Sequence, residues 1–396
     1  MKQCMTKLNI VLFCLLLAGF AYIGVFAPKD TSAAKEENRE LATMPALTAD
    51  TLFSGSFSQD FENYLADNVG YRSFFMNTAT KIESLKGFKP ETGRMVTANK
   101  SLGTGDAGEN HLLLLSDRVM EVYKKNDAAQ KAYIDALNLY AETLPEDIRI
   151  FSMLIPTQIE FYEDQSVSDS EKETIDTIYN TVNPRIITVP AYEKLSSHKD
   201  EYIYFRTDHH WTQRGAFYGY NAFLESAFST SVQLSDYHVS RRHGFLGYLY
   251  NQAKDPTLQK HADTIEMFTK GENLSFTAKA KENGQMVSYT AQLFKLPAQN
   301  ESPKYGIFMG GDHQFAEINT ENKNGKTLLV MKDSYANTLL PFLVEQYETV
   351  LVIDPRNFYS TVTALTEEYD IDDMLFVNYV FTTTFTDFID RMVAVR

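Results

Sequence analysis

Cysteine is nearly absent from this 396-residue sequence, which contains only Cys4 and Cys14. Both lie in an N-terminal apolar segment, so the rest of the chain has none. This distribution excludes disulfide bonds, a cysteine nucleophile and a cysteine-type zinc site from the body of the protein. Any chemistry in the body therefore depends on other side chains.

Basic residues are few compared with acidic ones: 37 lysines and arginines stand against 52 aspartates and glutamates, a formal net charge of −15. With a pI near 5.0, a nucleic-acid partner is not expected, because its phosphates would be repelled. The same balance suits a secreted enzyme that acts on neutral sugars. With 44% hydrophobic and 13% aromatic residues, the body can bury one large core or two modest ones.

The N-terminal segment carries a long apolar run, Leu8 to Ala27. At about 1.5 Å per residue in a helix, this run is long enough to cross one bilayer. Lys2 and Lys7 precede it and acidic residues follow it, which places the N-terminus in the cytoplasm and the body outside. Pro28, directly after the run, disfavours cleavage by signal peptidase. We therefore expect residues 1–27 to be an uncleaved signal anchor, a single transmembrane helix that holds an extracytoplasmic body on the cell membrane.

Residues 28–110 are predicted to be a tether and an N-terminal helical segment. The stretch from Lys29 to Pro45 is polar, charged and poor in aromatic residues, as a tether would be. Gly87 to Glu109 is rich in glycine and has little periodicity, which is typical of a loop. Between them, two amphipathic helices are indicated by apolar residues at helical spacing, namely Phe53, Phe57, Phe61, Tyr64 and Leu65, then Phe74, Phe75, Ala79, Ile82 and Leu85.

Residues 111–396 alternate between strand-like and helix-like segments, which predicts an α/β domain with a parallel sheet flanked by helices. Within this domain, residues 229–304 alternate apolar and polar side chains as antiparallel strands do. We expect a mainly β insertion here, lying over the active-site edge of the sheet as a substrate lid or as a structural subdomain. The expected strands are Ile148–Pro156, Arg185–Val189, Leu328–Met331, Thr349–Asp354 and Met374–Val380, with helices at Ser116–Leu144, Glu171–Val182 and Gly215–Phe228.

Reactive side chains gather at Asp208-His209-His210-Trp211, between a strand-like segment and an expected helix. In extended backbone, residues two apart point to the same side, so Asp208 and His210 would face one target while His209 points away. A neutral imidazole is a good general base near pH 7, and a carboxylate on its other nitrogen fixes the tautomer. The motif therefore predicts a general base with its orienting acid.

The best candidate for the nucleophile is Ser334. The apolar run Leu328–Met331 is typical of a buried parallel strand, and Tyr335–Gln346 of the helix that follows it. Ser334 would then lie at the tip of the strand. There its own backbone N–H, close to a helix N-terminus, could help to bind an oxyanion.

Two further positions at strand ends are candidate binding residues. The apolar segment from Tyr305 ends in Gly310 and Gly311, where backbone can approach a ligand closely, so Gly311 is expected to contribute to an oxyanion site. Arg356 follows the strand Thr349–Asp354 and would emerge at the carboxyl edge, where α/β sheets bind ligands.

The motif at Asp208 and the segment around Ser334 resemble the DHHW protein family and, more distantly, the alginate O-acetyltransferases built on an SGNH-hydrolase-like domain. The resemblance implies that Asp208 is the triad acid, His210 the base and Ser334 the nucleophile. It gives Trp211 the place of the adjoining aromatic beside the substrate and leaves His209 without a triad role. Arg356 matches a recurring Asp-x-Arg position, which implies a contact to an anionic intermediate or the acyl carbonyl. One departure is Lys332, where the hydrolase motif has glycine.

The function implied is O-acetyl transfer onto a cell-surface polysaccharide, without a cofactor and with a membrane-bound partner that supplies acetyl groups. Transferase and esterase share the same residues, so both stay open. Asp-His-His also resembles the metal-binding signature of the DHH phosphoesterases, but no Asp-x-Asp stands upstream, and no metal is expected. A third hypothesis is a catalytically silent carbohydrate-binding or envelope-assembly protein that keeps the fold.

Overall fold

The computed structural model describes residues 111–163, 166–253, 255–282, 284–298 and 301–396. Before residue 111 it also describes the stretches 11–15, 18–19, 22, 43–48, 51–52, 56–68, 70–71, 78 and 93–97. Within these stretches, no helix has the length and the hydropathy that a bilayer crossing requires. Most of the predicted anchor and tether falls outside the described residues.

The chain divides into two units, residues 1–89 with 254–256 and residues 90–253 with 257–396. In the first unit, helix α4 (Ser56–Asn68) confirms one of the two predicted amphipathic helices. The rings of Phe57, Phe61 and Tyr64 stack along it. The second of these helices lies almost wholly outside the described residues.

The second unit is built on an eight-stranded sheet with the order β5-β4-β13-β11-β12-β10-β8-β9. From β5 to β12 neighbouring strands are parallel, whereas β10, β8 and β9 are antiparallel. The predicted parallel sheet is thus the five-stranded part of a mixed sheet. The strands are β4 (Arg149–Ile155), β5 (Ile186–Thr188), β8 (Ser275–Glu282), β9 (Gln285–Gln292), β10 (Phe315–Asn319), β11 (Thr327–Lys332), β12 (Thr349–Ile353) and β13 (Asp373–Tyr379).

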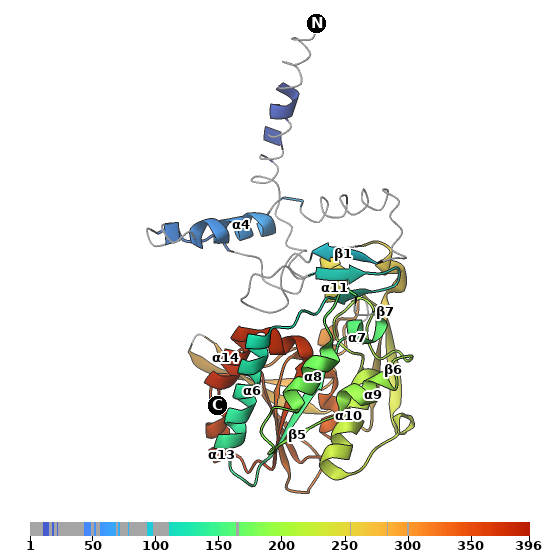
Figure 1. Cartoon of the computed structure of the whole chain (residues 1–396), viewed down its shortest axis with the longest axis vertical. Helices are drawn as coiled ribbons and strands as arrows, with labels where there is room; N and C mark the ends of the chain where they lie inside the picture. The colour runs from blue at the N-terminus through green and yellow to red at the C-terminus, as the bar shows by residue number, and fades with distance from the viewer. Residues whose placement is uncertain are drawn as a thin grey trace. The chain divides into compact units, whose positions relative to one another are not determined.

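Helices cover both faces of this sheet (Figure 1). Tyr140 of α6 packs edge-on against Phe376 of β13, and Phe223 of α10 packs against Phe151 of β4. Phe151 pairs with Leu375, so these two side chains point to the same face of the sheet. Phe376 follows Leu375 and therefore points to the opposite face. Helices α6 and α10 thus lie on opposite sides of the sheet. The helices are α6 (Asp127–Thr143), α7 (Gln158–Tyr162), α8 (Glu171–Tyr179), α9 (Ala191–Ser196), α10 (Gln213–Phe228), α11 (Tyr248–Ala253), α12 (Leu340–Leu343), α13 (Val362–Glu368) and α14 (Thr386–Ala394).

The segment predicted as one helix, Ser116–Leu144, is a strand followed by a helix. Strand β3 (Val119–Glu121) pairs with β2 (His111–Leu114), which pairs with β1 (Arg94–Thr97), in a separate antiparallel sheet. Helix α6 begins only after Asn126, whose side chain accepts a hydrogen bond from the N–H of Ala129. The polar run before Asn126 was the sequence signal for this start.

The insertion at 229–304 has the predicted β character but a different place in the fold. Strands β6 (His238–Phe245) and β7 (Asp263–Thr269) form a two-stranded ribbon. Strands β8 and β9 instead extend the main sheet beyond β10. This part of the insertion therefore extends the sheet instead of lying over its edge, because alternation predicts antiparallel pairing but not the partner strand.

Three short segments near the site also differ from prediction. Tyr202–Phe205 is held by a single bridge, Tyr204 to Trp211. The expected strand at 305 is a 3-10 turn, η4 (Tyr305–Ile307). The helix after Ser334 is another 3-10 turn, η5 (Ser334–Thr338), followed by the short α12. The remaining 3-10 turns are η2 (Leu234–Asp236), η3 (Leu258–His261) and η6 (Val380–Thr384).

Candidate active site

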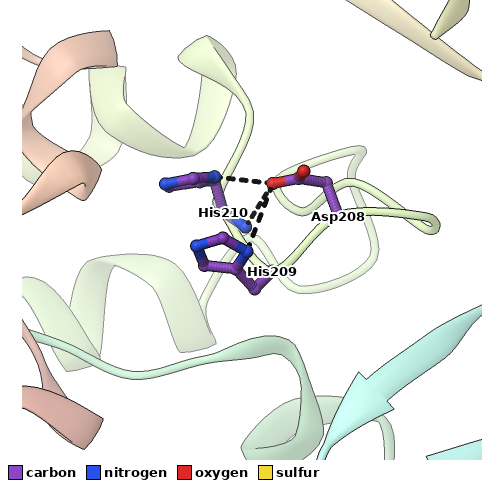
Figure 2. A group of neighbouring side chains, drawn as sticks. All are labelled: Asp208, His209 and His210. Atoms are coloured by element: carbon purple, nitrogen blue, oxygen red, sulfur yellow. Dashed lines mark hydrogen bonds and ion pairs between the residues drawn. The ribbon is translucent and has the colours of Figure 1, made fainter. Parts of the chain in front are cut away.

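Asp208, His210 and Ser334 form one chain of hydrogen bonds. Nδ1 of His210 lies 2.6 Å from Oδ1 of Asp208, as Figure 2 shows, and Nε2 of His210 lies 2.8 Å from Oγ of Ser334. With Nδ1 protonated and bonded to the carboxylate, Nε2 is left to accept the Ser334 proton. The structure thus brings together the three residues that the sequence assigns to acid, base and nucleophile.

The carboxylate of Asp208 is buried and held at both oxygens. Its Oδ1 also accepts the backbone N–H of His210 at 3.0 Å, and its Oδ2 accepts the N–H of Tyr248 at 2.8 Å. Burial alone would raise the pKa of Asp208, but the charge of His210 and these hydrogen bonds hold that pKa below its ordinary value. Asp208 therefore stays ionised where a triad acid must be.

The loop before Asp208 is anchored by a residue of the β6–β7 ribbon. The Oδ2 of Asp263 accepts the N–H and the hydroxyl of Thr207, at 2.8 and 2.5 Å. Its Oδ1 accepts the N–H of Arg206 at 2.8 Å. Gly247 packs against the same turn and donates its N–H to the Thr207 hydroxyl at 3.0 Å. The insertion thus reaches the site through its backbone and one carboxylate.

Trp211 is fully buried and links the two halves of the site. Its Nε1–H donates to the backbone oxygen of Tyr335, next to Ser334, at 2.8 Å. Gly219 of α10 leaves room for the indole, because a Cβ there would lie 2.8 Å from the ring. The expectation that Trp211 contacts substrate is corrected: a side chain with no exposure supports the serine turn instead.

The serine turn is fixed by the residues before Ser334. Asp333 caps it, accepting the N–H of Tyr335 at 2.9 Å with one oxygen and the N–H of Tyr379 at 2.9 Å with the other. None of the described residues accepts a hydrogen bond from the N–H of Ser334. That N–H, at the start of η5, would be free to bind an oxyanion formed by attack of Ser334 on a carbonyl group.

Gly311 does not supply the second oxyanion donor that was expected. Its N–H donates to the carbonyl of Phe308 at 3.2 Å, inside a tight turn. Met309, Gly310 and Gly311 all have positive φ values, of 61°, 79° and 111°. The paired glycines thus serve the turn, the commoner use of such a pair.

Lys332 and Arg356 meet at Asp312, a residue without a predicted role. The Nζ of Lys332 lies 2.5 Å from Oδ1 of Asp312, and Arg356 contacts Oδ2 of Asp312 at 3.0 Å and Asp354 at 2.5 Å. Although burial alone would raise it, the charges of Lys332 and Arg356 hold the pKa of Asp312 below its ordinary value. Lys332, where the hydrolase motif has glycine, therefore points into this ion-pair cluster. The contact of Arg356 with an acyl group stays a prediction.

His209 does not point away from its neighbours. Its ring lies 3.8 Å from that of His210 between centroids, and its Nδ1 lies 3.7 Å from Oδ1 of Asp208. Figure 2 shows the ring of His209 beside that of His210, with a dashed line to Asp208. The prediction assumed extended backbone, but residues 206–210 form a bend. Within the described residues, these three side chains are the group that could hold a metal ion, with ligand atoms within 4.8 Å of one another. Asp208 and His210 already bind each other through Oδ1 and Nδ1, a hydrogen bond that a metal ion at those two atoms would have to displace.

The model of the DHHW protein family matches residues 89–353. The chain belongs to the DHHW protein family. None of the curated proteins matches it in sequence. Among solved structures, a DHHW family protein from Eubacterium siraeum is 27% identical, with a TM-score of 0.62, covering 75% of this chain and 97% of that one. PatB1 from Bacillus cereus, in a structure with a sulfonyl adduct, is 18% identical, with a TM-score of 0.60, covering 70% of this chain and 97% of that one; at this identity the likeness shows the shared fold.

Several residues that shape the site in this DHHW protein had no assigned role in the sequence. The hydroxyl of Tyr305 donates a hydrogen bond to the backbone oxygen of Ser334 at 2.7 Å. Asp263 and Gly247 bind Thr207, next to Asp208. Asp312 binds Lys332 and Arg356. All four lie outside the two motifs. Only their distances in the folded chain identify them, since no spacing rule connects them with Asp208 or Ser334.

Proposed function

We propose that this DHHW protein is an extracytoplasmic serine acyltransferase or esterase, acting on O-acetyl groups of a cell-surface polysaccharide. The observation that carries the proposal is the continuous hydrogen-bond chain from Asp208 through His210 to Ser334. A serine hydroxyl is a weak nucleophile until a base removes its proton, and this chain supplies the base and its orienting acid.

In the first half-reaction, Oγ of Ser334 attacks the carbonyl carbon of an acetyl ester while Nε2 of His210 takes the Oγ proton. The carbonyl oxygen becomes an oxyanion that the N–H of Ser334 can bind. The tetrahedral intermediate then collapses, the bond to the alcohol breaks, and the leaving oxygen receives the proton from His210. Asp208 stabilises the imidazolium throughout, and acetyl-Ser334 remains.

In the second half-reaction, a hydroxyl group attacks the acetyl carbonyl. His210 takes the proton of the incoming hydroxyl and returns a proton to Ser334 as the ester bond to the enzyme breaks. A sugar hydroxyl makes the protein a transferase, and water makes it an esterase. The resemblance of the motifs to alginate O-acetyltransferases supports the sugar acceptor.

The place of the reaction is proposed from the sequence. Lysines before the apolar run Leu8 to Ala27 favour a body outside the cell membrane, where surface polysaccharides are found. Activated acetyl donors are made inside the cell, so a membrane-bound partner that delivers acetyl groups completes the proposal.

Turnover of p-nitrophenyl acetate by the purified full-length chain tests the proposed nucleophile and base. Ser334→Ala and His210→Ala should each lower kcat/KM by roughly 10³-fold or more, and the double variant should lose little more, because triad members act as a unit. Ser288→Ala, at an exposed position in β9, is the matched control and should keep full activity. A folded Ser334→Ala variant with wild-type turnover would remove the basis of the proposal.

One observation favours a second candidate, a metal-dependent phosphoesterase: the ligand atoms of Asp208, His209 and His210 lie within 4.8 Å of one another. The triad needs no divalent ion, whereas that candidate does. Acetyl ester turnover should therefore survive a chelator. Loss of turnover on chelation, restored by manganese, would favour the metal candidate, while sugar binding without any turnover would favour a silent binding protein.

A further inference from the structure

Tyr305 contacts both the base and the nucleophile of the proposed site. Its ring lies parallel to the imidazole of His210, with 3.6 Å between centroids and 6° between planes. Its hydroxyl donates a hydrogen bond to the backbone oxygen of Ser334 at 2.7 Å. Tyr305 begins the turn η4, directly after the insertion. One side chain from outside both motifs thus spans the two groups between which the proton moves.

The imidazole of His210 is enclosed on both faces. The ring of His209 lies 3.8 Å away between centroids, tilted by 35°. Two rings this close to one imidazole cannot share a face without overlapping, so Tyr305 and His209 lie on opposite faces. In the ring plane, Asp208 and Ser334 bind the two nitrogens. Hydrogen bonds fix the imidazole within its plane, and the two rings fix it perpendicular to that plane.

We propose that Tyr305 is a positioning residue of the acyl-transfer site, which stabilises the protonated form of His210 through its ring and holds the serine turn through its hydroxyl. The inference rests on the proposed function, because it concerns the state of His210 after Ser334 has given up its proton. At that stage a cation lies against the electron-rich face of a phenol, a favourable cation–π arrangement.

The groups around His210 are suited to this role. Asp208 is the anion beside its Nδ1, and the ring of Tyr335 lies 5.1 Å away between centroids. Burial, and then the charge of His210, lowers the pKa of His209 to about 3. The ring on the second face is therefore neutral at working pH, and no second cation competes with the imidazolium.

The two contacts of Tyr305 can be separated by substitution. Tyr305→Phe keeps the stacked ring and loses the hydroxyl, and should lower kcat/KM of ester hydrolysis by about 3- to 10-fold, the effect of one hydrogen bond. Tyr305→Leu loses both contacts and should lower it by roughly 30- to 100-fold. Without the aromatic face, the imidazolium is less stable, so the acid limb of the pH profile of kcat/KM should move by about 0.5 to 1 unit to lower pH. That limb should not move in Tyr305→Phe.

Tyr218→Leu is the matched control, because Tyr218 stacks on His198 with the same 3.6 Å between centroids, outside the site. It should leave both the rate and the acid limb unchanged. If Tyr305→Leu does not fold, Tyr305→Met replaces it, because methionine fills the space without a ring. The acid limb of its pH profile should move to lower pH by the same amount.

The inference is overturned if Tyr305→Leu, or Tyr305→Met in its place, folds and keeps the wild-type acid limb, or if Tyr305→Phe moves that limb as far as the leucine variant does. Failure of the proposed function has a different signature. The wild-type chain would then hydrolyse no acetyl ester, or Ser334→Ala would hydrolyse it as well as wild type, whatever residue stands at position 305.

Discussion

Substitution of Gly247 by alanine probes the support of Asp208, the proposed triad acid, without altering any residue of the proposed triad. A Cβ at Gly247 would lie 2.3 Å from Cβ of Asp208, 2.5 Å from its Oδ2 and 2.8 Å from its Cα. Ordinary contacts begin near 3.4 Å. Two of these three atoms, Cβ and Cα, cannot be moved away by any rotation of the Asp208 side chain. Alanine therefore forces either Asp208 or the segment of Tyr248 to shift by about 1 Å.

Such a shift should affect activity more than stability. Overpacking of this kind costs about 1 to 3 kcal/mol of unfolding free energy. The moved atoms include those of the 2.6 Å contact between Asp208 and His210 and the 2.8 Å hydrogen bond from Tyr248. A misplacement of about 1 Å costs roughly 10²-fold in rate, and complete loss of the acid's orienting role costs about 10⁴-fold. We therefore expect kcat/KM of Gly247→Ala to be about 10²- to 10⁴-fold lower than that of wild type.

The assay is p-nitrophenyl acetate hydrolysis together with urea unfolding, and Gly306→Ala is the control. A Cβ at Gly306 meets nothing within 4 Å, and its φ is not in the positive range, so this variant should behave as wild type. Should Gly247→Ala keep more than half of the wild-type kcat/KM, the contact between its backbone and Asp208 would have no part in catalysis.

Three further predictions follow from the buried groups and from the N-terminus. Trp211→Phe removes the hydrogen bond to the Tyr335 oxygen and should lower the free energy of unfolding by about 1 to 3 kcal/mol; an unchanged urea midpoint would contradict this. Burial raises the pKa of Glu171 from 4.5 to about 8 and that of Glu121 well above its ordinary value. The stability contributed by the neutral form of Glu171 is fully present below pH 4.5 and is lost as the pH rises towards 8. The stability contributed by neutral Glu121 is lost in the same direction, so Glu121→Gln should lose less stability than wild type between pH 5 and 8. Equal losses would show that Glu121 does not titrate in this range. Finally, alkaline phosphatase fused after Lys35 should be active; activity of a cytoplasmic reporter at that position instead would reverse the predicted orientation.

The three residues of the proposed triad were predictable from the sequence because they lie in short local patterns. Asp208 and His210 stand in one motif, and Ser334 follows an apolar run that is fully buried as β11. The strands β4, β12 and β13 were predictable for the same reason, since a buried parallel strand is a continuous apolar run. Their order in the sheet was not, because it depends on contacts between distant segments.

The support of the triad could not be predicted because it depends on long-range contacts and on bends. Asp263 binds Thr207, 56 residues away, and Tyr305 binds Ser334, 29 residues away. The two-residue periodicity failed for His209, since the backbone there bends instead of extending. Gly311 and Trp211 were assigned binding roles from residue type alone, whereas the folded chain uses one in a turn and the other in the core.

The most direct test of the central claim is the mass of the intact full-length protein, and of its peptides, after reaction with an aromatic sulfonyl fluoride. If His210 activates Ser334, the wild-type chain should gain one sulfonyl group, located on Ser334. Ser334→Ala should gain none, and His210→Ala should react far more slowly. A label on another residue, or equal labelling of wild type and Ser334→Ala, would contradict the account.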